Sequence, residues 1–260
     1  MTVDVGALSS ALLAPVERIA RDAGALILAV YAQEFAVLEK ADASPVTAAD
    51  DAAERCIVAG LQALQPQWPI VAEEAAARGE LPRLDGGAFW LVDPLDGTRE
   101  FVARNGEFTV NIALVAGGRP VLGVVLEPVA GRLYAGVVGQ GAWLSDAAGR
   151  RAIACRVAPA DGVVLACSRS HGDEAALSAW LGSQRVLRRV AVGSSLKFGL
   201  LASGQADVYP RLTRTMEWDT AAGDAVLTAA GGSVTDLAGA LLRYGKAGFE
   251  NPHFVARGRT

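Results

Sequence analysis

The feature that most constrains the fold is a block of four β-rich stretches between about residues 107 and 145. Gly or Pro separates each stretch from the next, and the stretches read EFTVNIALV, RPVLGVVLEP, GRLYAGVVG and GAWLS. Short strands divided by turn residues at this spacing are typical of an antiparallel meander. The sequence therefore predicts an antiparallel sheet in the middle of the chain.

After residue 160 the chain alternates between strand-like and helix-like segments. The strand-like segments are GVVLACS, QRVLRRVAV and DVYPRL, and each precedes a helical segment, in turn GDEAALSAWLG, SSLKFGLLASG and DTAAGDAVLTAAGG. This alternation predicts a second sheet with helices packed against it.

The segment before the meander predicts two helices and two short strands. Apolar residues recur at a spacing of three to four over residues 7–33, and a second helix is expected over 47–64 with Thr47 as its start signal. The apolar runs at 69–73 and 88–92 are bounded by breakers and predict buried strands. Both runs are followed closely by carboxylates.

Together these elements predict an α+β chain in which two sheets are interleaved with helices. We expect the sheets to be joined near residues 145–160 and divide the chain into an α+β part, 1–150, and an α/β part, 151–260. A chain of 260 residues is long enough to bury a large core.

Composition excludes several classes of protein. The chain is 52% apolar and 20% charged with a net charge of −4, which is typical of a folded globular protein. Without a basic excess, a nucleic-acid polymer is not expected as a partner. The three cysteines are odd in number and widely spaced, which favours reduced thiols in a cytoplasmic protein. No secretion signal or membrane span is expected, because no long uncharged apolar run is found.

Two aspartates, Asp93 and Asp96, flank Pro94 directly after the apolar run at 88–92. A turn is one explanation, since Asp, Pro and Gly are common turn formers and either aspartate could cap the helix suggested by TREFVAR. The chemical alternative is that Pro94 and Gly97 bend the backbone so that both carboxylates and the Leu95 carbonyl face one point.

Three further carboxylates lie at the edges of predicted elements, and each has a structural alternative. Glu73 could be a solvated charge at a strand end, Asp50 could lie on the wet face of a helix, and Asp219 could be a helix N-cap. If the acids instead converge, oxygen ligands of this kind suit Mg²⁺. Two such ions about 3.5 to 4 Å apart can activate a water and stabilise the leaving oxygen of a phosphoryl transfer.

Four motifs, in this order, resemble those of the inositol monophosphatase superfamily: KADASPVTAAD, AEEA, VDPLDGT and EWDTAAG. The resemblance spans nearly the whole chain and implies a five-layered α-β-α-β-α sandwich. Longer blocks, including GSSLKFGLLASGQADVYPRL, are similar to the CysQ branch of 3'(2'),5'-bisphosphate nucleotidases.

The resemblance also implies roles for individual residues. The implied metal ligands are Glu73, Asp93, the Leu95 carbonyl, Asp96 and Asp219, with Asp93 as the bridge between two ions. Asp50, Glu73 and Thr98 would orient or activate the attacking water. The implied substrate-binding residues are Glu73, Leu95, Asp96, Gly97, Thr98 and Asp219 around the phosphate, and His171, Ser194, Lys197 and Arg211 around the nucleoside and its second phosphate.

From this resemblance we expect a Mg²⁺-dependent phosphatase that holds two or three ions. It would remove the 3'-phosphate of adenosine 3',5'-bisphosphate and could also act on 3'-phosphoadenylyl sulfate. The resemblance further implies a role in sulfur assimilation, inhibition by lithium and, as in many relatives, a homodimer. One alternative is an inositol monophosphatase or general phosphatase acting on another small phosphate ester, and another is a non-catalytic nucleotide sensor.

Overall fold

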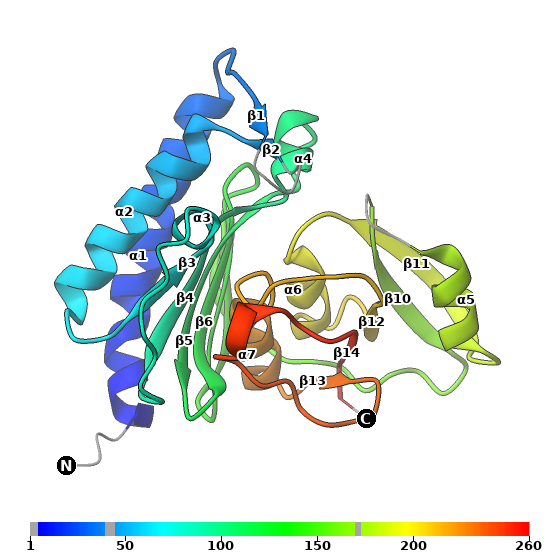
Figure 1. Ribbon diagram of the computed structural model, residues 1–260. Coiled ribbons are helices and arrows are strands. Elements are labelled where there is room, and N and C mark those ends of the chain that lie inside the picture. Colours follow the sequence, from blue (N-terminus) through cyan, green and yellow to red (C-terminus); the bar gives the residue numbers. More distant parts are fainter. Residues whose placement is uncertain (1–4, 40–44, 170–172, 260) are drawn as a thin grey trace.

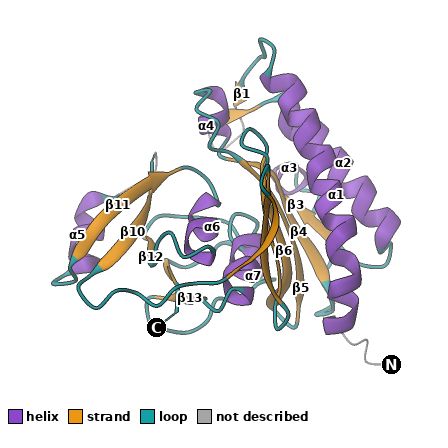
Figure 2. Cartoon of the chain, turned by 180° about the vertical axis from the view of Figure 1, so that it is seen from behind, coloured by secondary structure: helices purple, strands orange, loops and turns teal. Residues whose placement is uncertain are grey.

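The computed structural model describes residues 5–39, 45–169 and 173–259, which form five stacked layers (Figures 1 and 2). The outer helices α1 (Val5–Tyr31) and α2 (Ala48–Leu64) cover one face of a seven-stranded sheet. Helices α6 (Leu196–Ala202) and α7 (Ala221–Ala229) lie between this sheet and a five-stranded sheet, and α5 (Glu174–Leu181) covers the far side. The predicted α-β-α-β-α sandwich is confirmed.

The seven-stranded sheet contains the predicted meander. Its strands, in spatial order, are β3 (Ile70–Ala72), β4 (Phe89–Asp96), β5 (Thr109–Ala116), β6 (Arg119–Glu127), β7 (Arg132–Val137), β8 (Gly141–Asp146) and β9 (Gly149–Ile153). All neighbouring pairs from β4 onward are antiparallel, and β3 pairs parallel to β4. The short polar β9 extends the meander beyond its predicted end. It was not predicted because its exposed residues lack the alternation that marks a half-buried strand.

The five-stranded sheet has the order β11 (Val186–Val192), β10 (Val163–Ser168), β12 (Val208–Arg211), β14 (Phe254–Arg257) and β13 (Ser233–Asp236). The three predicted strands pair in parallel, β10 lying between β11 and β12. The strands β13 and β14 were not predicted; both are four residues long and antiparallel to their neighbours. The proposed division of the chain at residue 150 falls within β9 and stays a prediction.

Three hydrophobic clusters hold the layers together. One lies between α1, α2 and the larger sheet, the second fills the space between the sheets around α6 and α7, and the third lies under α5. The middle helix α7 approaches the larger sheet very closely, since a Cβ at Gly123 of β6 would lie 2.2 Å from the carbonyl oxygen of Ala222. Glycine is therefore required at this contact.

The remaining elements are short and cluster near the ends of the sheets. They are β1 (Leu38–Glu39), β2 (Pro45–Val46), α3 (Glu73–Ala77), α4 (Thr98–Val102) and the 3₁₀ helix η1 (Ala247–Phe249). Helices α3 and α4 follow β3 and β4 directly, so the acidic residues at those strand ends lie beside one another. Within the described residues, no helix has the length and apolar character that a membrane span requires.

Candidate active site

A bulge in β4 turns Asp93 and Asp96 toward the same cavity. Asp93 pairs with Asn111 of β5 and Asp96 pairs with Thr109, so three steps along β4 match two along β5. Side chains three residues apart on a regular strand point to opposite faces, and one extra residue reverses this relation. Pro94, which has no amide hydrogen for the ladder, lies inside the bulge.

Gly97 connects the bulged strand to α4. Its φ of +90° is in the left-handed region, and a Cβ there would approach the carbonyl oxygen of Glu107 to 3.3 Å. The chain can thus turn within one residue and begin α4 at Thr98. The expected helix over TREFVAR is confirmed, and neither aspartate is its N-cap, because Gly97 holds that position.

Asp50 and Thr98 form a hydrogen-bonded pair between α2 and α4. Asp50 is only 1% exposed, so it does not lie on the wet face of its helix. Its Oδ2 accepts hydrogen bonds from the amide and hydroxyl of Thr47, both at 2.8 Å, in a capping box at the start of α2. Its Oδ1 accepts from the Thr98 hydroxyl at 3.4 Å.

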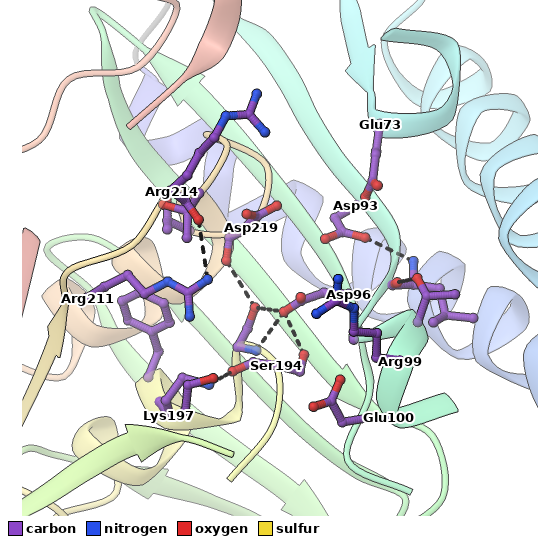
Figure 3. Close-up of a pocket in the computed structure, with 18 of the residues that line it drawn as sticks. Glu73, Asp93, Asp96, Arg99, Glu100, Ser194, Lys197, Arg211, Arg214 and Asp219 are labelled. Carbon is purple, nitrogen blue, oxygen red and sulfur yellow. Dashed lines mark hydrogen bonds between the residues drawn. The ribbon is translucent and has the colours of Figure 1, made fainter. Parts of the chain in front are cut away.

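Glu73 and Asp219 complete an acidic cluster with Asp93 and Asp96 (Figure 3). Glu73 opens α3, and Asp219 lies two residues before α7, where Thr220 rather than Asp219 is the N-cap. The N-cap alternative for Asp219 is therefore wrong. Its Oδ2 instead accepts a hydrogen bond of 2.8 Å from the amide of Met216.

Burial and mutual repulsion raise the pKa values of two acids in this cluster. Burial raises the pKa of Asp93 well above its ordinary value, and the charges of Glu73, Asp96 and Asp219 raise it further. The pKa of Asp219 is also raised well above its ordinary value, by burial and then by the charges of Asp96 and Glu73. The cluster therefore holds more negative charge than its surroundings balance.

The chemistry of the cluster fits a divalent cation. Among the described residues, no three acidic, His or Cys side chains are placed tightly enough to hold an ion as they stand. The four carboxylates instead surround a shared cavity, and hard oxygen donors with excess negative charge are the environment that Mg²⁺ prefers. A bound cation would relieve the repulsion that raises the pKa values of Asp93 and Asp219.

Two serines of the loop before α6 hold Asp96 in place. The Asp96 Oδ2 accepts hydrogen bonds from the Ser194 hydroxyl at 2.6 Å, the Ser195 amide at 2.7 Å and the Ser195 hydroxyl at 2.8 Å. Ser194 was predicted to bind the nucleoside, and the structure gives it this contact with a predicted metal ligand. Ser195 was missed, because a serine in a loop carries no specific sequence signal.

The cavity has a volume of about 340 Å³ and changes in charge from one side to the other. Figure 3 shows Glu73 and Asp93 on one side and Lys197 and Arg211 on the opposite side, with Asp96 and Asp219 between them. The exposed Arg214, which the sequence analysis did not single out, also lines the cavity, and its Nε donates to Glu250 at 3.1 Å. The site can therefore hold a cation on its acidic side and contact an anionic group on its cationic side.

Lys197 differs from the two arginines because it is buried. Its ammonium donates to the carbonyl oxygens of Val192 at 3.1 Å and Ser194 at 2.5 Å, and burial lowers its pKa to about 8. Ser194 has a φ of +53°, a conformation that costs a non-glycine residue about 1 to 3 kcal/mol. The bond from Lys197 to the Ser194 carbonyl helps to hold this strained loop.

The structure brings together all the predicted site residues that it describes. Those lining the cavity are Glu73, Asp93, Leu95, Asp96, Gly97, Thr98, Ser194, Lys197, Arg211 and Asp219. Asp50 lies behind Thr98 through their hydrogen bond. His171 lies outside the described residues, and its predicted role stays a prediction.

Comparison with known proteins identifies the class to which this fold and its acid-lined cavity belong. The sequence model of the inositol monophosphatase family matches residues 9–257, and the chain belongs to this family. Its members depend on a metal ion, generally Mg²⁺.

Particular relatives narrow the comparison within the family. The 3'(2'),5'-bisphosphate nucleotidase CysQ of Escherichia coli (strain K12) is 47% identical over 240 residues, covering 91% of this chain and 96% of that protein. The CysQ of Salmonella typhimurium is 46% identical over 246 residues, 94% of this chain and 98% of that protein.

Two solved structures match over nearly the whole of this chain. The crystal structure of CysQ from Bacteroides thetaiotaomicron matches with a TM-score of 0.80 and 37% identity over 97% of this chain and 98% of that one. An inositol monophosphatase from Anabaena matches with a TM-score of 0.76 and 26% identity over 96% of this chain and 91% of that one.

Proposed function

We propose that this chain is a Mg²⁺-dependent phosphatase that hydrolyses the 3'-phosphate of adenosine 3',5'-bisphosphate to give AMP and phosphate. 3'-Phosphoadenylyl sulfate, which carries the same 3'-phosphate, would be a second substrate. The proposal is supported by the relatives named CysQ, which are 46% and 47% identical over more than nine-tenths of this chain. The observation that carries it is the division of one cavity into an acidic side and a cationic side.

The acidic side would hold two Mg²⁺ ions through Glu73, Asp93, Asp96, Asp219 and the Leu95 carbonyl. When bound, the ions would activate a water molecule, neutralise the phosphate and stabilise the departing ribose oxygen. Asp96 would use Oδ1, because the three donors from Ser194 and Ser195 converge on Oδ2. The proposal extends to a third Mg²⁺ ion at this acidic side.

The pair formed by Thr98 and Asp50 would orient the attacking water. The Thr98 hydroxyl has one hydrogen, which is within reach of Asp50 Oδ1 at 3.4 Å and of the Leu95 carbonyl at 3.2 Å, so its oxygen can accept a hydrogen from water. Glu73, which opens α3 on the acidic side of the cavity, would be the second residue to orient this water. Water held in line with the departing oxygen is already close to its reacting geometry.

The cationic side would bind the 5'-phosphate. Arg211 and Arg214 both line the cavity, and a side-chain nitrogen of Arg211 donates to the Arg214 carbonyl at 3.3 Å. Lys197 would support this side through its charge and by holding the Ser194 loop. The amides of Gly97 and Thr98 would contact the reacting 3'-phosphate, and His171 and Ser194 would lie near the nucleoside.

The test compares three substrates: adenosine 3',5'-bisphosphate, 3'-AMP and inositol 1-phosphate. A charge-assisted contact is worth about 1.5 to 3 kcal/mol, so kcat/KM for the bisphosphate should exceed that for each monophosphate roughly ten- to more than a hundredfold. Arg211→Ala should reduce this preference with little effect on the monophosphates, because only the bisphosphate carries the 5'-phosphate that Arg211 would contact.

Arg151→Ala is the control, because Arg151 is an arginine of β9 that forms an ion pair with Asp146 and does not line the cavity. It should leave all three rates unchanged. Equal turnover of inositol 1-phosphate and the nucleotide by the unmodified protein would favour the general phosphatase alternative. Binding of the bisphosphate without turnover in the presence of Mg²⁺ would favour the nucleotide sensor.

A further inference from the structure

Asp219 is presented by a tight turn that immediately precedes α7. The amide of Asp219 donates to the Met216 carbonyl at 3.2 Å, and the amides of Thr220 and Ala221 donate to the Glu217 carbonyl at 3.2 and 2.9 Å. The Asp219 carboxylate also accepts from the Met216 amide. The position of Asp219 therefore depends on how the backbone of residues 216 and 217 is held.

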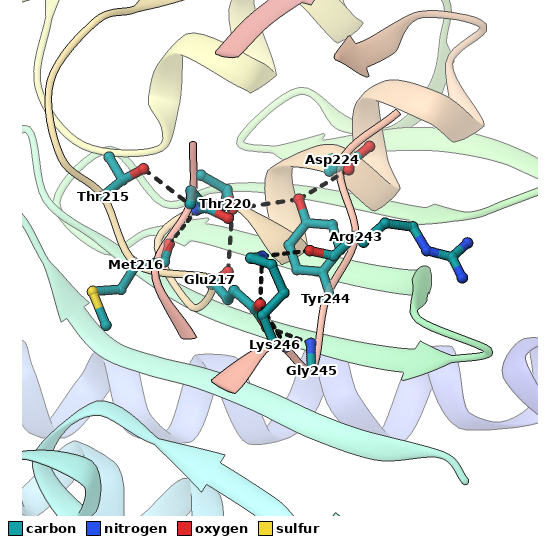
Figure 4. Close-up of polar contacts among 10 residues, drawn as sticks. Thr215, Met216, Glu217, Thr220, Asp224, Arg243, Tyr244, Gly245 and Lys246 are labelled. Carbon is teal, nitrogen blue, oxygen red and sulfur yellow. Dashed lines mark hydrogen bonds and ion pairs between the residues drawn. The ribbon is translucent and has the colours of Figure 1, made fainter. Parts of the chain in front are cut away.

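The side chain of Glu217 anchors this turn to residues 245 and 246 (Figure 4). Its side chain is fully buried, and its carboxylate accepts from the Gly245 amide at 2.6 Å, the Lys246 amide at 3.0 Å and the Lys246 ammonium at 2.5 Å. Burying a carboxylate is costly unless it is paired and hydrogen-bonded, and Glu217 meets both conditions.

A C-terminal segment, residues 243–251, forms the other side of these contacts and is called the strap. Besides Gly245 and Lys246, it contributes the Phe249 carbonyl, which accepts from the Glu217 amide at 2.8 Å, and the Asn251 side chain, which donates to the Met216 carbonyl at 2.7 Å. The turn and strap are thus joined by charged and neutral hydrogen bonds on both sides of Glu217.

Glu217 does not line the cavity, so it has no direct contact with a substrate or ion there. Glu217 acts on Asp219 through the backbone of residues 216 and 217. The side chain and the amide of Glu217 hold this backbone against the strap. Groups that orient a metal ligand typically change metal affinity 10- to 100-fold when they are removed.

We propose that Glu217 is a positioning residue for Asp219, which it holds in the orientation that binds the metal by fixing the turn at residues 215–220 to the strap. This inference rests on the proposed function, in which Asp219 is a metal ligand. Lys246 is the partner that holds the Glu217 carboxylate in place, through their ion pair and the Lys246 amide.

The first test is Glu217→Gln, whose amide group keeps the size of the side chain but cannot accept all three hydrogen bonds. Mg²⁺ affinity is measured by calorimetry on the full chain without substrate, and amide hydrogen exchange of residues 215–221 is followed in EDTA. We expect the Mg²⁺ dissociation constant to rise about tenfold or more and exchange in the turn to accelerate.

The matched control is Asp207→Asn, because Asp207 is also a buried carboxylate that accepts from a cation and a backbone amide. Its partners are Arg156 at 2.7 and 2.8 Å and the Val164 amide at 2.7 Å, and it does not line the cavity. A general loss of stability would weaken Mg²⁺ binding equally in both variants. Only Glu217→Gln should do so if Glu217 positions Asp219.

Lys246→Met and Lys246→Arg provide a second test that does not depend on the folding of Glu217→Gln. The arginine variant keeps a cation beside Glu217 and should bind Mg²⁺ nearly as the unmodified protein does, while the methionine variant should bind it several-fold more weakly. Equal Mg²⁺ affinity in the methionine, arginine and unmodified proteins, or equal weakening in Glu217→Gln and Asp207→Asn, would overturn the inference. Failure of the unmodified protein to bind Mg²⁺ would instead overturn the proposed function.

Discussion

Replacing Asp93 by Asn should raise the stability of the metal-free protein and abolish turnover in the presence of Mg²⁺. Asp93 is 1% exposed, and its Oδ1 accepts a hydrogen bond of 3.0 Å from the Leu95 amide. The side-chain oxygen of Asn can accept the same bond. The substitution therefore removes a charge and leaves this local contact in place.

The direction of the stability change follows from the pKa of Asp93, which burial and the neighbouring carboxylates raise. A raised folded-state pKa means that the carboxyl group destabilises the fold increasingly as the pH rises from its ordinary value through the raised one. Above that range, each like-charged neighbour in a partly hydrated site costs on the order of 1 kcal/mol. Asp93→Asn should then increase the free energy of unfolding at pH 8 in EDTA by about 1 to 3 kcal/mol, raising Tm by roughly 3 to 10 °C.

Calorimetric melting in EDTA and in saturating Mg²⁺, combined with phosphate release, measures both effects. The unmodified protein should melt at a higher temperature with Mg²⁺, whereas the variant should respond little, because a neutral amide cannot bridge two divalent ions. A variant that melts below the unmodified protein in EDTA would refute the repulsion argument. A folded variant with more than about a tenth of normal turnover, a barrier change under roughly 1.4 kcal/mol, would refute the bridging role.

The remaining predictions concern ions and the attacking water. Li⁺ is close to Mg²⁺ in size but has half its charge, so LiCl should inhibit turnover where equal NaCl does not; Ca²⁺, which prefers more ligands at longer distances, should also inhibit. Equal rates in LiCl and NaCl would count against a lithium-sensitive site. Thr98→Val removes the hydroxyl that bonds Asp50 and should lower kcat by about 10²- to 10⁴-fold, whereas Thr98→Ser should retain most of it. Similar kcat values for the two variants would show that the hydroxyl does not orient the water.

Much of the fold follows from patterns that act over short distances. The meander and the alternating second half were predicted because buried strands and amphipathic helices carry strong periodic signals. The strands β13 and β14 were missed because they are four residues long and depend on long-range pairing, β14 with β12 and β13 with β14. Their formation is a tertiary effect that no local window contains.

The motifs indicated which residues lie together at the cavity better than they indicated its geometry. Pro94 and Gly97 indicated a special backbone, yet the one-residue bulge that turns Asp93 and Asp96 to the same cavity depends on the register with β5. The hydrogen bonds from Ser195 to Asp96, across 99 residues of sequence, likewise depend on the packing of the two sheets. Sequence alone could not separate these contacts from ordinary loop serines.

The most direct test of the central claim is phosphorus NMR of adenosine 3',5'-bisphosphate during turnover in water enriched in oxygen-18. If water attacks the 3'-phosphorus, the products are unlabelled 5'-AMP and inorganic phosphate that carries one labelled oxygen, and neither forms in EDTA. Formation of 3'-AMP, or of phosphate without the label, would contradict the account. Unchanged turnover in EDTA would contradict its dependence on Mg²⁺.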